Sequence, residues 1–392
     1  MSSASLHPSR VAGGSSRPTP RSGAATSSCA PRRHTVTPPS TPLGAAAHQV
    51  SLRQKAELKC QSHNGGASPS EPALKQQSEL LKLNASVKPH QATPAIANGD
   101  VPPEPSIGNT KALSTETMDN LPPTLRNFVL KGKTAIVTGG ARGLGLAMSQ
   151  ALCEAGIKAV AIFDIQPKLG QSVAQSLHTA TGIPVKYHNV DITNESNVEA
   201  AVKQVIQQFG GIDILINSAG VAFSNLPAEK QSLDIFRKTI DINLTGSYIM
   251  AQVVGRYMIK TTPKATSHSH PQLPDRSIIF IASMSGSIVN YPQRQSAYNT
   301  SKAAVIMLSK CLAAEWAEYG IRVNTISPGY MDTVLNRTPE LTQQKVTWKQ
   351  RTPLGRLGKE EELNNVMVWL AGEGARFVTG GDYKVDGGYS VY

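Results

Sequence analysis

Tyr298 and Lys302 are the two side chains whose types and spacing first suggest chemistry. They stand four residues apart in a segment with helical periodicity, so both project from one face of the helix. A free phenol titrates at about pH 10. A neighbouring ammonium stabilises the phenolate, which would bring the pKa of Tyr298 towards the range useful for acid–base catalysis. Pairs with this spacing also occur on solvated helix faces, so the pair alone assigns no activity.

Three further polar residues would have to converge on this pair. Ser285 stands thirteen residues before Tyr298, just beyond an apolar run, and Asn217 ends an earlier apolar run. The carboxyl ends of parallel strands meet at the edge where open α/β sheets bind ligands. Asn243 lies in a run of helical periodicity, where an amide among apolar neighbours needs a partner. Each residue also has an ordinary structural explanation, as a turn, a cap or a satisfied core amide.

A glycine-rich turn, TGGARGLG at 138–145, follows the first apolar run. Gly139 allows a tight turn, Gly143 lets the backbone approach a pyrophosphate, and Gly145 allows close packing of helix on strand. The N-terminus of the helix that follows would direct unpaired N–H groups and the positive end of its dipole at the phosphates. Isolated glycines can serve packing alone, but this strand–turn–helix context predicts a dinucleotide site.

The second apolar run ends at Asp164, about 20 residues after the glycines. A carboxylate there accepts hydrogen bonds from the hydroxyls of an adenosine ribose and repels a 2′-phosphate. Arg142, inside the glycine turn, would instead favour a 2′-phosphate. The alternative for Asp164 is that it is an ordinary loop residue without a role at the cofactor. Because the carboxylate stands directly at the strand end, the sequence favours NAD over NADP.

From Phe128 onward, short apolar runs rich in Val and Ile alternate with segments of helical periodicity. Strands that are apolar on both faces and separated by helices indicate an α/β domain with a parallel sheet covered on both sides. We expect one such domain over 129–392. The expected strands are 134–138, 159–164, 185–189, 212–217, 277–283, 322–327 and a run near 383–385, and the expected helices are 144–155, 168–180, 195–208, 232–259, 297–318 and 360–371.

Residues 1–128 have a different composition, rich in Ser, Pro, Ala, Thr and Gly and without an aromatic residue before Phe128. Such a segment cannot bury enough apolar surface to offset its ordering entropy, so we expect a long disordered N-terminal extension. Its first 56 residues carry arginines and many serines but no acidic residue, as in a mitochondrial transit peptide. The expected location is the cytoplasm, with the mitochondrial matrix as the alternative.

The net charge of +12 suggests a polyanionic partner, yet half of the basic excess lies in that extension. The extension has no block of like charges and no aromatic residues on which bases could stack, so nucleic-acid binding is not expected. The four cysteines are far apart and show no zinc-ligand spacing, so no metal is expected. No apolar stretch reaches about 18 residues, so no membrane span is expected.

Together these residues resemble the short-chain dehydrogenase/reductase family over essentially all of 130–392. Ser218 departs from the pattern, since the family usually has a second asparagine there. The resemblance implies a single doubly wound Rossmann-type domain with a seven-stranded parallel sheet, assembled as a homodimer or homotetramer. The residues in the family's order are the glycine turn, Asp191, Asn217–Gly220, Asn243, Ser285, Tyr298, Lys302, Pro328, Gly329 and Thr333.

The resemblance also implies roles. Tyr298 would be the general acid/base for the substrate oxygen, while Lys302 would lower the tyrosine pKa and bind the nicotinamide ribose. Ser285 would orient the substrate oxygen, and Asn243 would anchor a water in the proton relay. Hydride would pass between the substrate carbon and the nicotinamide. The residues expected at the cofactor are Gly139, Arg142, Gly143, Leu144, Gly145, Asp164, Asp191, Ile192, Asn217, Ala219, Gly220, Tyr298, Lys302, Pro328, Gly329 and Thr333.

The expected mouth of the site is mostly polar, which favours a small substrate with several hydroxyls. The segments 326–333, 352–356 and 385–389 resemble the fungal sugar-alcohol branch, which includes arabinitol, mannitol and sorbose enzymes, and this implies polyol–ketose interconversion. The alternatives are a 3-oxoacyl or other ketone reductase and a catalytically silent dinucleotide-binding regulator, which would not need the four catalytic residues. The mouth residues are Asn290, Tyr291, Gln293, Arg294, Gln295, Tyr330, Met331 and Asp332.

Overall fold

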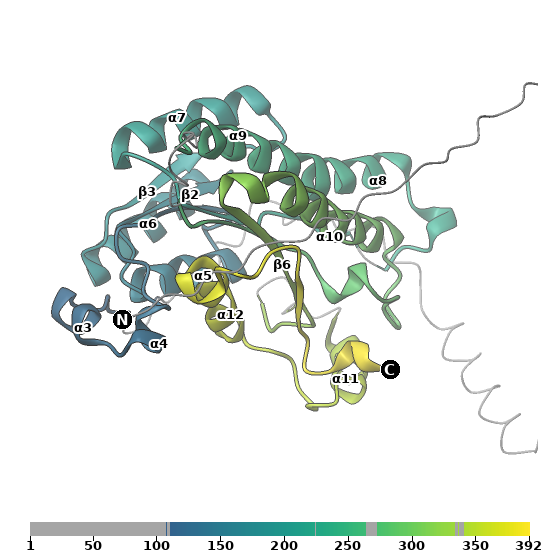
Figure 1. Cartoon of the computed structure of the whole chain (residues 1–392). Helices are drawn as coiled ribbons and strands as arrows, with labels where there is room; N and C mark the ends of the chain where they lie inside the picture. Colours follow the sequence, from purple (N-terminus) through teal and green to yellow (C-terminus); the bar gives the residue numbers. More distant parts are fainter. Residues whose placement is uncertain (1–106, 108–109, 224, 264–272, 334–335, 337–340) are drawn as a thin grey trace, which may run out of the picture. The chain divides into compact units, whose positions relative to one another are not determined.

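A parallel sheet with the strand order β3-β2-β1-β4-β5-β6-β7 forms the centre of the described chain (Figure 1). The computed structural model describes residues 107, 110–223, 225–263, 273–333, 336 and 341–392. Its seven strands confirm the expected fold class and strand number. The strands are β1 (Thr134–Thr138), β2 (Ala159–Asp164), β3 (Val185–Asn189), β4 (Ile214–Asn217), β5 (Arg276–Ile281), β6 (Ile321–Pro328) and β7 (Asp382–Val385).

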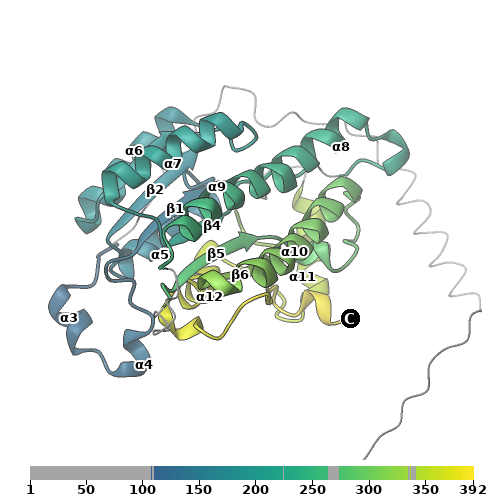
Figure 2. The ribbon, with the colours of Figure 1, turned by 45° about the horizontal axis from the view of Figure 1, so that its top comes forward.

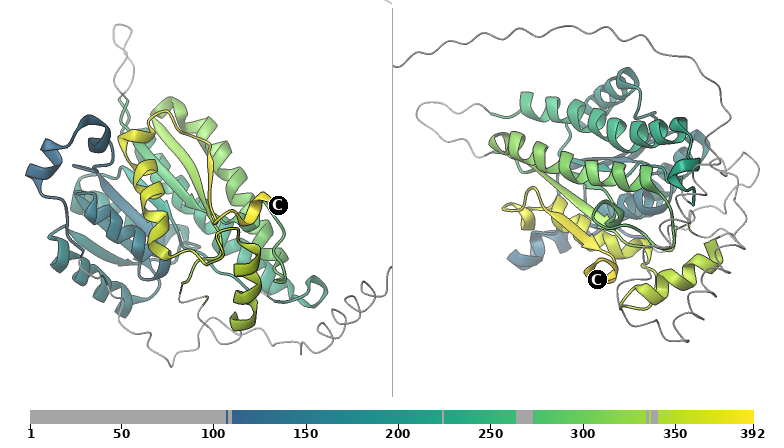
Figure 3. Two further views of the ribbon diagram at one scale, coloured as in Figure 1. Left: turned by 90° about the horizontal axis from the view of Figure 1, so that it is seen from below. Right: turned by 90° about the vertical axis from the view of Figure 1, so that its right-hand side faces the viewer.

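Helices cover both faces of the sheet, as Figures 2 and 3 show. They are α5 (Gly143–Glu154), α6 (Pro167–Thr181) and α12 (Asn364–Ala371) on one face, and α7 (Glu195–Phe209), α9 (Ser247–Lys260) and α10 (Ser296–Trp316) on the other. Successive strand residues point to opposite faces. Ile136 therefore packs into one core cluster, while Ala135 and Val137 pack into the other. Burial on both faces explains why β1, β2 and β4 are largely apolar, whereas the edge strands β3 and β7 contain charged and polar residues.

The strand ends are aligned by the register of the sheet. Thr138 at the end of β1 pairs with Phe163 in β2 and with Asn217 in β4, and Asn217 pairs with Phe280 in β5. The strand order reverses at β1, which has β2 on one side and β4 on the other. The carboxyl edge at this reversal is where open α/β sheets bind ligands.

The helix expected over 232–259 is divided in three. It begins as α8 (Leu233–Ile240), continues as a π-helical turn over Asp241–Gly246, and ends as α9. A π-turn inserts one residue per turn relative to an α-helix and is often found at functional sites. Asn243 lies within this turn and not within a regular helix.

The extension becomes ordered earlier than expected. Within the segment assigned to disorder, α3 (Thr115–Asn120) and α4 (Pro123–Arg126) are helical. Met118 is buried, with its sulfur against Gly156, and the Leu113 N–H bonds to the Glu154 carbonyl at 3.3 Å. The segment thus packs against the C-terminal end of α5. The expected boundary at residue 128 is wrong for these residues, because a single buried methionine and backbone bonds replace the missing aromatic residues.

Some expectations lie outside the described residues. These are the state of residues 1–106 and the transit-like composition of residues 1–56. Within the described part of the chain, no helix combines the length and the apolar character needed to cross a membrane.

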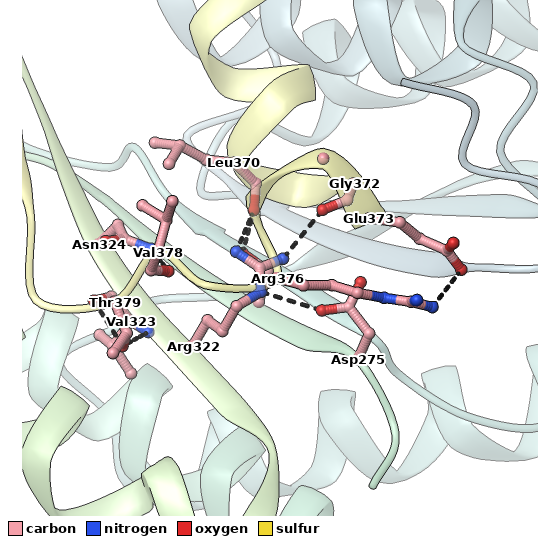
Figure 4. A network of polar contacts seen from close by, with 12 residues as sticks. Asp275, Arg322, Val323, Asn324, Leu370, Gly372, Glu373, Arg376, Val378 and Thr379 are labelled. Atoms are coloured by element: carbon pink, nitrogen blue, oxygen red, sulfur yellow. Dashed lines mark hydrogen bonds and ion pairs between the residues drawn. The ribbon is translucent and has the colours of Figure 1, made fainter. Parts of the chain in front are cut away.

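The amino ends of the central strands carry a polar network (Figure 4). Arg322 on β6 donates to the Asp275 carboxylate at 2.9 Å and to the carbonyls of Leu370 and Gly372 at 2.8 and 3.2 Å. Lys133 reaches the other oxygen of Asp275 at 2.9 Å. Burial acts to raise the pKa of Asp275, but the two cations together hold this pKa below its usual value. The network ties β5, β6 and the end of α12 together at the edge opposite the carboxyl ends.

Candidate active site

The glycine turn between β1 and α5 has room for a dinucleotide pyrophosphate. Gly143, the first residue of α5, has a φ of 56° and open space where a Cβ would stand. A Cβ on Gly145 would lie 2.2 Å from the Gly139 carbonyl oxygen, so helix and turn pack too closely for a side chain there. The unpaired N–H groups at the start of α5 therefore have space beside them that phosphates fit.

Asp164 lies at the carboxyl end of β2, beside this turn. One carboxylate oxygen accepts a hydrogen bond from the Ala141 N–H at 3.2 Å, and the other accepts one from the Gln166 N–H at 3.1 Å. The carboxylate is thus partly used within the turn, and its residue is buried. Arg142, the residue before α5, is half-buried, and it has no ion pair with any other described residue.

The turn after β4 is tied to the end of β1. The Thr138 hydroxyl accepts hydrogen bonds from the N–H groups of Ser218 and Ala219 at 3.1 and 3.0 Å. Because Ser218 makes this contact through its backbone, the serine in place of an asparagine does not affect it. Asn217 donates to the Ser247 carbonyl at 3.1 Å, while its own side-chain oxygen is buried without a partner among the described residues. Such an atom is available to a ligand.

The other residues expected at the cofactor follow strands at the same edge. Asp191 accepts hydrogen bonds from the N–H and the hydroxyl of Thr193 at 2.9 and 2.7 Å, which orders the turn after β3. The remaining positions are Leu144 at the start of α5, Ile192 after β3, Gly220 after β4, and Pro328, Gly329 and Thr333 at and beyond the end of β6.

Tyr298 and Lys302 lie together on α10. The Lys302 ammonium nitrogen is 5.6 Å from the centre of the Tyr298 ring and donates to the Ile281 carbonyl at 2.8 Å. Burial lowers the pKa of Lys302 to about 8. Burial also raises the pKa of Tyr298, while a hydrogen bond with the Ser283 side chain acts in the opposite direction. The pKa of Tyr298 is therefore raised and not lowered as expected, because desolvation is its largest cause and Ser283, rather than Lys302, is the group that acts to lower it.

Asn243 joins the turn after β4 to α10. Its side-chain oxygen accepts from the Val221 N–H at 2.8 Å, and its nitrogen donates to the Val221 carbonyl at 2.9 Å and to the Ser301 hydroxyl at 3.0 Å. The Ser301 hydroxyl in turn donates to the Tyr298 carbonyl at 2.7 Å. The amide is 1% exposed and is occupied by protein groups. Its position in the structure is that of a brace for the helix that carries Tyr298.

Ser283 is the functional candidate that the sequence missed. Its side chain hydrogen-bonds Tyr298, and its hydroxyl donates to the Ser285 hydroxyl at 3.0 Å. Ser285, the serine expected from the sequence, is therefore linked to the phenol through Ser283. Strand β5 ends at Ile281, two residues before the expected end at residue 283, which frees Ser283 for the ligand-binding edge. The sequence offers two candidate serines, one on each side of Met284. Choosing between them requires knowing the residue at which β5 ends.

A buried polar network continues from Ser285 into the expected mouth. Gln295 donates to the Ser285 hydroxyl at 3.2 Å and to the Asn290 side-chain oxygen at 3.0 Å. Asn290 donates to the Tyr330 hydroxyl at 2.9 Å, and that hydroxyl donates to Gln293 at 3.2 Å. Burial raises the pKa of Tyr330, which keeps this hydroxyl protonated.

The other mouth residues divide between the surface and the core. Tyr291 and Arg294 are exposed, and the ring of Tyr291 lies under the Arg351 guanidinium at 5.2 Å. Met331 is 4% exposed and belongs to the apolar core. Tyr330 therefore bonds Asn290 and Gln293, and Asn290 bonds Gln295, whereas Met331 lies in the core. That these polar residues line the mouth of the site stays a prediction.

Comparison with known proteins gives a consistent result. The model of a family described as enoyl-(acyl carrier protein) reductase matches residues 139–390. Sorbose reductase of Schizosaccharomyces pombe is 37% identical over 263 residues, which are 67% of this chain and 97% of that protein. A probable NADP-dependent mannitol dehydrogenase of Yarrowia lipolytica is 36% identical over 267 residues, 68% of this chain and 90% of the relative.

A solved structure has the same fold. It is the crystal structure of a gluconate 5-dehydrogenase from Burkholderia cenocepacia J2315 in complex with NADP and tartrate. The two chains are 31% identical with a TM-score of 0.62, and the match covers 68% of this chain and 99% of the other.

Replacing Lys302 by Met should stabilise the free protein below pH 8 while abolishing turnover. A pKa lowered from 10.5 to about 8 means that the charged form of Lys302 destabilises the folded protein by about 3 kcal/mol at pH 7. Losing the bond to Ile281 offsets about 1 kcal/mol of that gain. Between pH 8 and 10.5 the unfolded wild type binds more protons than the folded form, so wild-type stability rises and the advantage of Lys302→Met shrinks.

Thermal unfolding midpoints measured from pH 7 to pH 10 test this. Lys310→Met, at an exposed position on the same helix, is the matched control. A Lys302→Met protein that is less stable than wild type at pH 7, or whose advantage grows with pH, contradicts the expectation.

Proposed function

Since this chain belongs to the short-chain dehydrogenase/reductase family, and is therefore an oxidoreductase acting on a CH–OH group with a nicotinamide dinucleotide, we propose that its substrates are a polyol and the corresponding ketose. The observation that carries the proposal is the agreement between the names of the relatives and the polar mouth. Sorbose and mannitol are both polyhydroxylated, and the expected mouth holds the buried amides of Asn290 and Gln295 and the half-buried phenol of Tyr330 in one hydrogen-bonded group. A site whose buried polar groups need hydroxyl partners rejects substrates that lack them.

In the proposed mechanism each residue acts on the substrate oxygen or on its neighbours. When bound, the dinucleotide supplies or accepts the hydride at the substrate carbon. The Tyr298 hydroxyl gives a proton to the oxygen during ketone reduction and takes it back during alcohol oxidation. The Ser283 hydroxyl, beside the phenol, donates a hydrogen bond to the same oxygen, a role that we move from Ser285 to Ser283. Lys302 stabilises the phenolate formed during reduction.

The burial of Tyr298 supports this direction of proton flow. Its raised pKa keeps the phenol protonated at neutral pH, which suits a proton donor for ketone reduction. For oxidation the same residue needs assistance from the ammonium of Lys302, whose pKa of about 8 leaves it charged at neutral pH.

For the cofactor we propose NADP in place of the NAD that the sequence favoured. The mannitol dehydrogenase relative is named NADP-dependent, and the gluconate dehydrogenase was solved with NADP. Both oxygens of Asp164 already accept backbone hydrogen bonds, which weakens its repulsion of a phosphate. Arg142 beside the turn is free of ion pairs with other described residues and is suited to a phosphate contact.

The description of the matching family model names an acyl substrate, which fits no feature of this mouth. An acyl chain requires an apolar channel, whereas the groups beyond Ser285 are amides and a phenol. A silent dinucleotide-binding regulator would have no need for a half-buried Tyr298 next to a buried Lys302 and beside a serine.

We also propose that the protein forms a homodimer or homotetramer through α9 and α10. Apolar side chains are exposed on both helices, with Tyr248 on α9 at 40% and Met307 on α10 at 59%. Between them lies a cavity of about 300 Å³ lined by both helices. Two copies of a surface with exposed apolar residues can cover each other around a twofold axis.

The substrate proposal predicts turnover of mannitol, sorbitol, arabinitol or xylitol with NADP, followed at the absorbance of the reduced nicotinamide. Tyr298→Phe should lower kcat at least about 100-fold, because the acid/base contributes that much or more, while dinucleotide binding persists. Tyr291→Phe, at an exposed tyrosine of the same region, is the control. Turnover of an acetoacetyl thioester with none of the polyols or their ketoses would overturn the proposal, as would full activity of Tyr298→Phe.

The cofactor proposal predicts a higher kcat/KM with NADP than with NAD. Arg142→Ala should lower kcat/KM for NADP by about 10- to 100-fold, the value of a charge-assisted hydrogen bond, and leave that for NAD much less affected. Asp164→Asn should raise kcat/KM for NADP, because it removes the nearest negative charge. A wild-type preference for NAD, with no selective effect of Arg142→Ala, would restore the original expectation.

The assembly proposal predicts a mass in light scattering of two or four times the 41.7 kDa chain. Met307→Glu places a charge in the proposed interface and should shift the protein towards monomer. Leu233→Glu, a similarly exposed apolar position on α8, should not. A monomeric wild type at micromolar concentration rules the interface out.

A further inference from the structure

The polar network behind Ser283 has a defined direction, set by one backbone carbonyl. Asn299 donates from its side-chain nitrogen to the Ile288 carbonyl at 3.0 Å, which fixes the orientation of this amide because a carbonyl can only accept. The same nitrogen donates to the side-chain oxygen of Asn290 at 3.2 Å. Asn290 therefore presents its oxygen to Gln295, and Gln295 must present its nitrogen.

The orientation of Gln295 passes to the two serines. The nitrogen that faces Asn290 also donates to the Ser285 hydroxyl oxygen at 3.2 Å. The Ser285 and Ser283 hydroxyls are 3.0 Å apart, and the Ser285 N–H donates to the Ser283 oxygen at 3.2 Å. Gln295, Ser285 and Ser283 are at most 8% exposed, so solvent contributes little to this arrangement.

A hydroxyl group has one proton to donate. With Gln295 donating to Ser285, the Ser285 proton can turn to the Ser283 oxygen, and the Ser283 proton is then released for an oxygen outside the pair. In the structure the Ser283 proton is directed at Ser285, so productive binding requires both hydroxyls to rotate. Hydroxyl rotation needs no movement of heavy atoms, and hydrogen bonds in such a chain strengthen one another.

We propose that Gln295 is a positioning residue: because it donates to Ser285, both serine hydroxyls can turn when substrate binds and form a chain of donors from Gln295 to Ser285 to Ser283 and from there to the substrate oxygen. The inference rests on the proposed function, because it needs Ser283 to donate to that oxygen. It gives Ser285 a function as the middle member of the chain. It also explains why an amide is buried at the start of α10, where its side chain makes no cap for the helix.

Gln295→Glu reverses the chain without changing its shape. An ionised carboxylate accepts the Ser285 proton, Ser285 then accepts from Ser283, and the substrate oxygen loses its donor. We expect kcat for ketose reduction to fall by about 30-fold or more at pH 8, compared with about 100-fold or more on removal of an oxyanion donor. At lower pH the protonated carboxyl can donate its single proton to Ser285, although it cannot donate to Asn290 as well, so the ratio of variant to wild-type kcat should rise with one titration while KM changes little.

The matched control is Gln293→Glu, the same substitution two residues away. Gln293 already accepts a hydrogen bond, from Tyr330, so a carboxylate there keeps the direction of its contact and its activity ratio should not depend on pH. Gln295→Met, which neither donates nor accepts, should be impaired at every pH. On a Ser285→Ala background, adding Gln295→Glu should produce no further pH-dependent loss, because the middle of the chain is gone.

Wild type and Tyr298→Phe measured on the same ketose separate the two possible failures. If wild type reduces no ketose, the proposed function fails. If wild type is active and Tyr298→Phe is not, the proposed function stands. In that case the positioning inference alone is overturned if the ratio of Gln295→Glu to wild-type kcat is independent of pH, or if Gln295→Met matches wild type. Should Gln295→Glu not fold, as judged by circular dichroism, full activity of Gln295→Met and of Ser285→Ala would overturn it.

Discussion

Helices cover both faces of the sheet, so a polar side chain placed along a central strand loses its hydration and needs a partner inside the protein. Ile136 and Ile279 are wholly buried, and Asn324, a polar residue within β6, is hydrogen-bonded to the Val378 carbonyl and the Gly381 N–H. Many other polar groups of the sheet lie near the strand ends. One edge carries the glycine turn and the residues around Tyr298. The other carries the network of Asp275 and Arg322 (Figure 4), in which every charge has a partner.

The two edges use buried charge differently. At the amino edge the Asp275 carboxylate is matched by two cations, which stabilises the junction of β5 and β6. At the carboxyl edge Lys302 is buried and forms no ion pair with another described residue; its ammonium lies near the Ile281 carbonyl, the Tyr298 ring and Gly220. Burying that ammonium lowers the stability of the fold. Such destabilising groups with shifted pKa values are common at functional sites. The braces that hold the ammonium are the π-turn and the Asn243 amide, which fix α10 against the turn after β4.

Sequence patterns identified β1, β2 and β3 to the residue. β1 and β2 are largely apolar, buried strands, whereas β3 is an edge strand that mixes apolar and polar residues. The patterns failed where the boundary is chemically ambiguous. Ser283 and Ser285 are the same residue type, and only the end of β5 decides which one faces Tyr298. The π-turn was invisible because its residues continue the apolar spacing of a helix. Helix α11 (Thr342–Arg351) was missed because its apolar residues are Val346 and Trp348, which stand two positions apart and form no face at helical spacing.

The helix that begins at the glycine turn also fixes where the rest of the chain is attached. Helix α5 is 12 residues long, so its far end is about 18 Å from the pyrophosphate turn, and it is there that the segment with α3 and α4 docks. A substitution that loosens α3 or α4 would therefore disturb the C-terminal end of α5 first, and not the glycine turn.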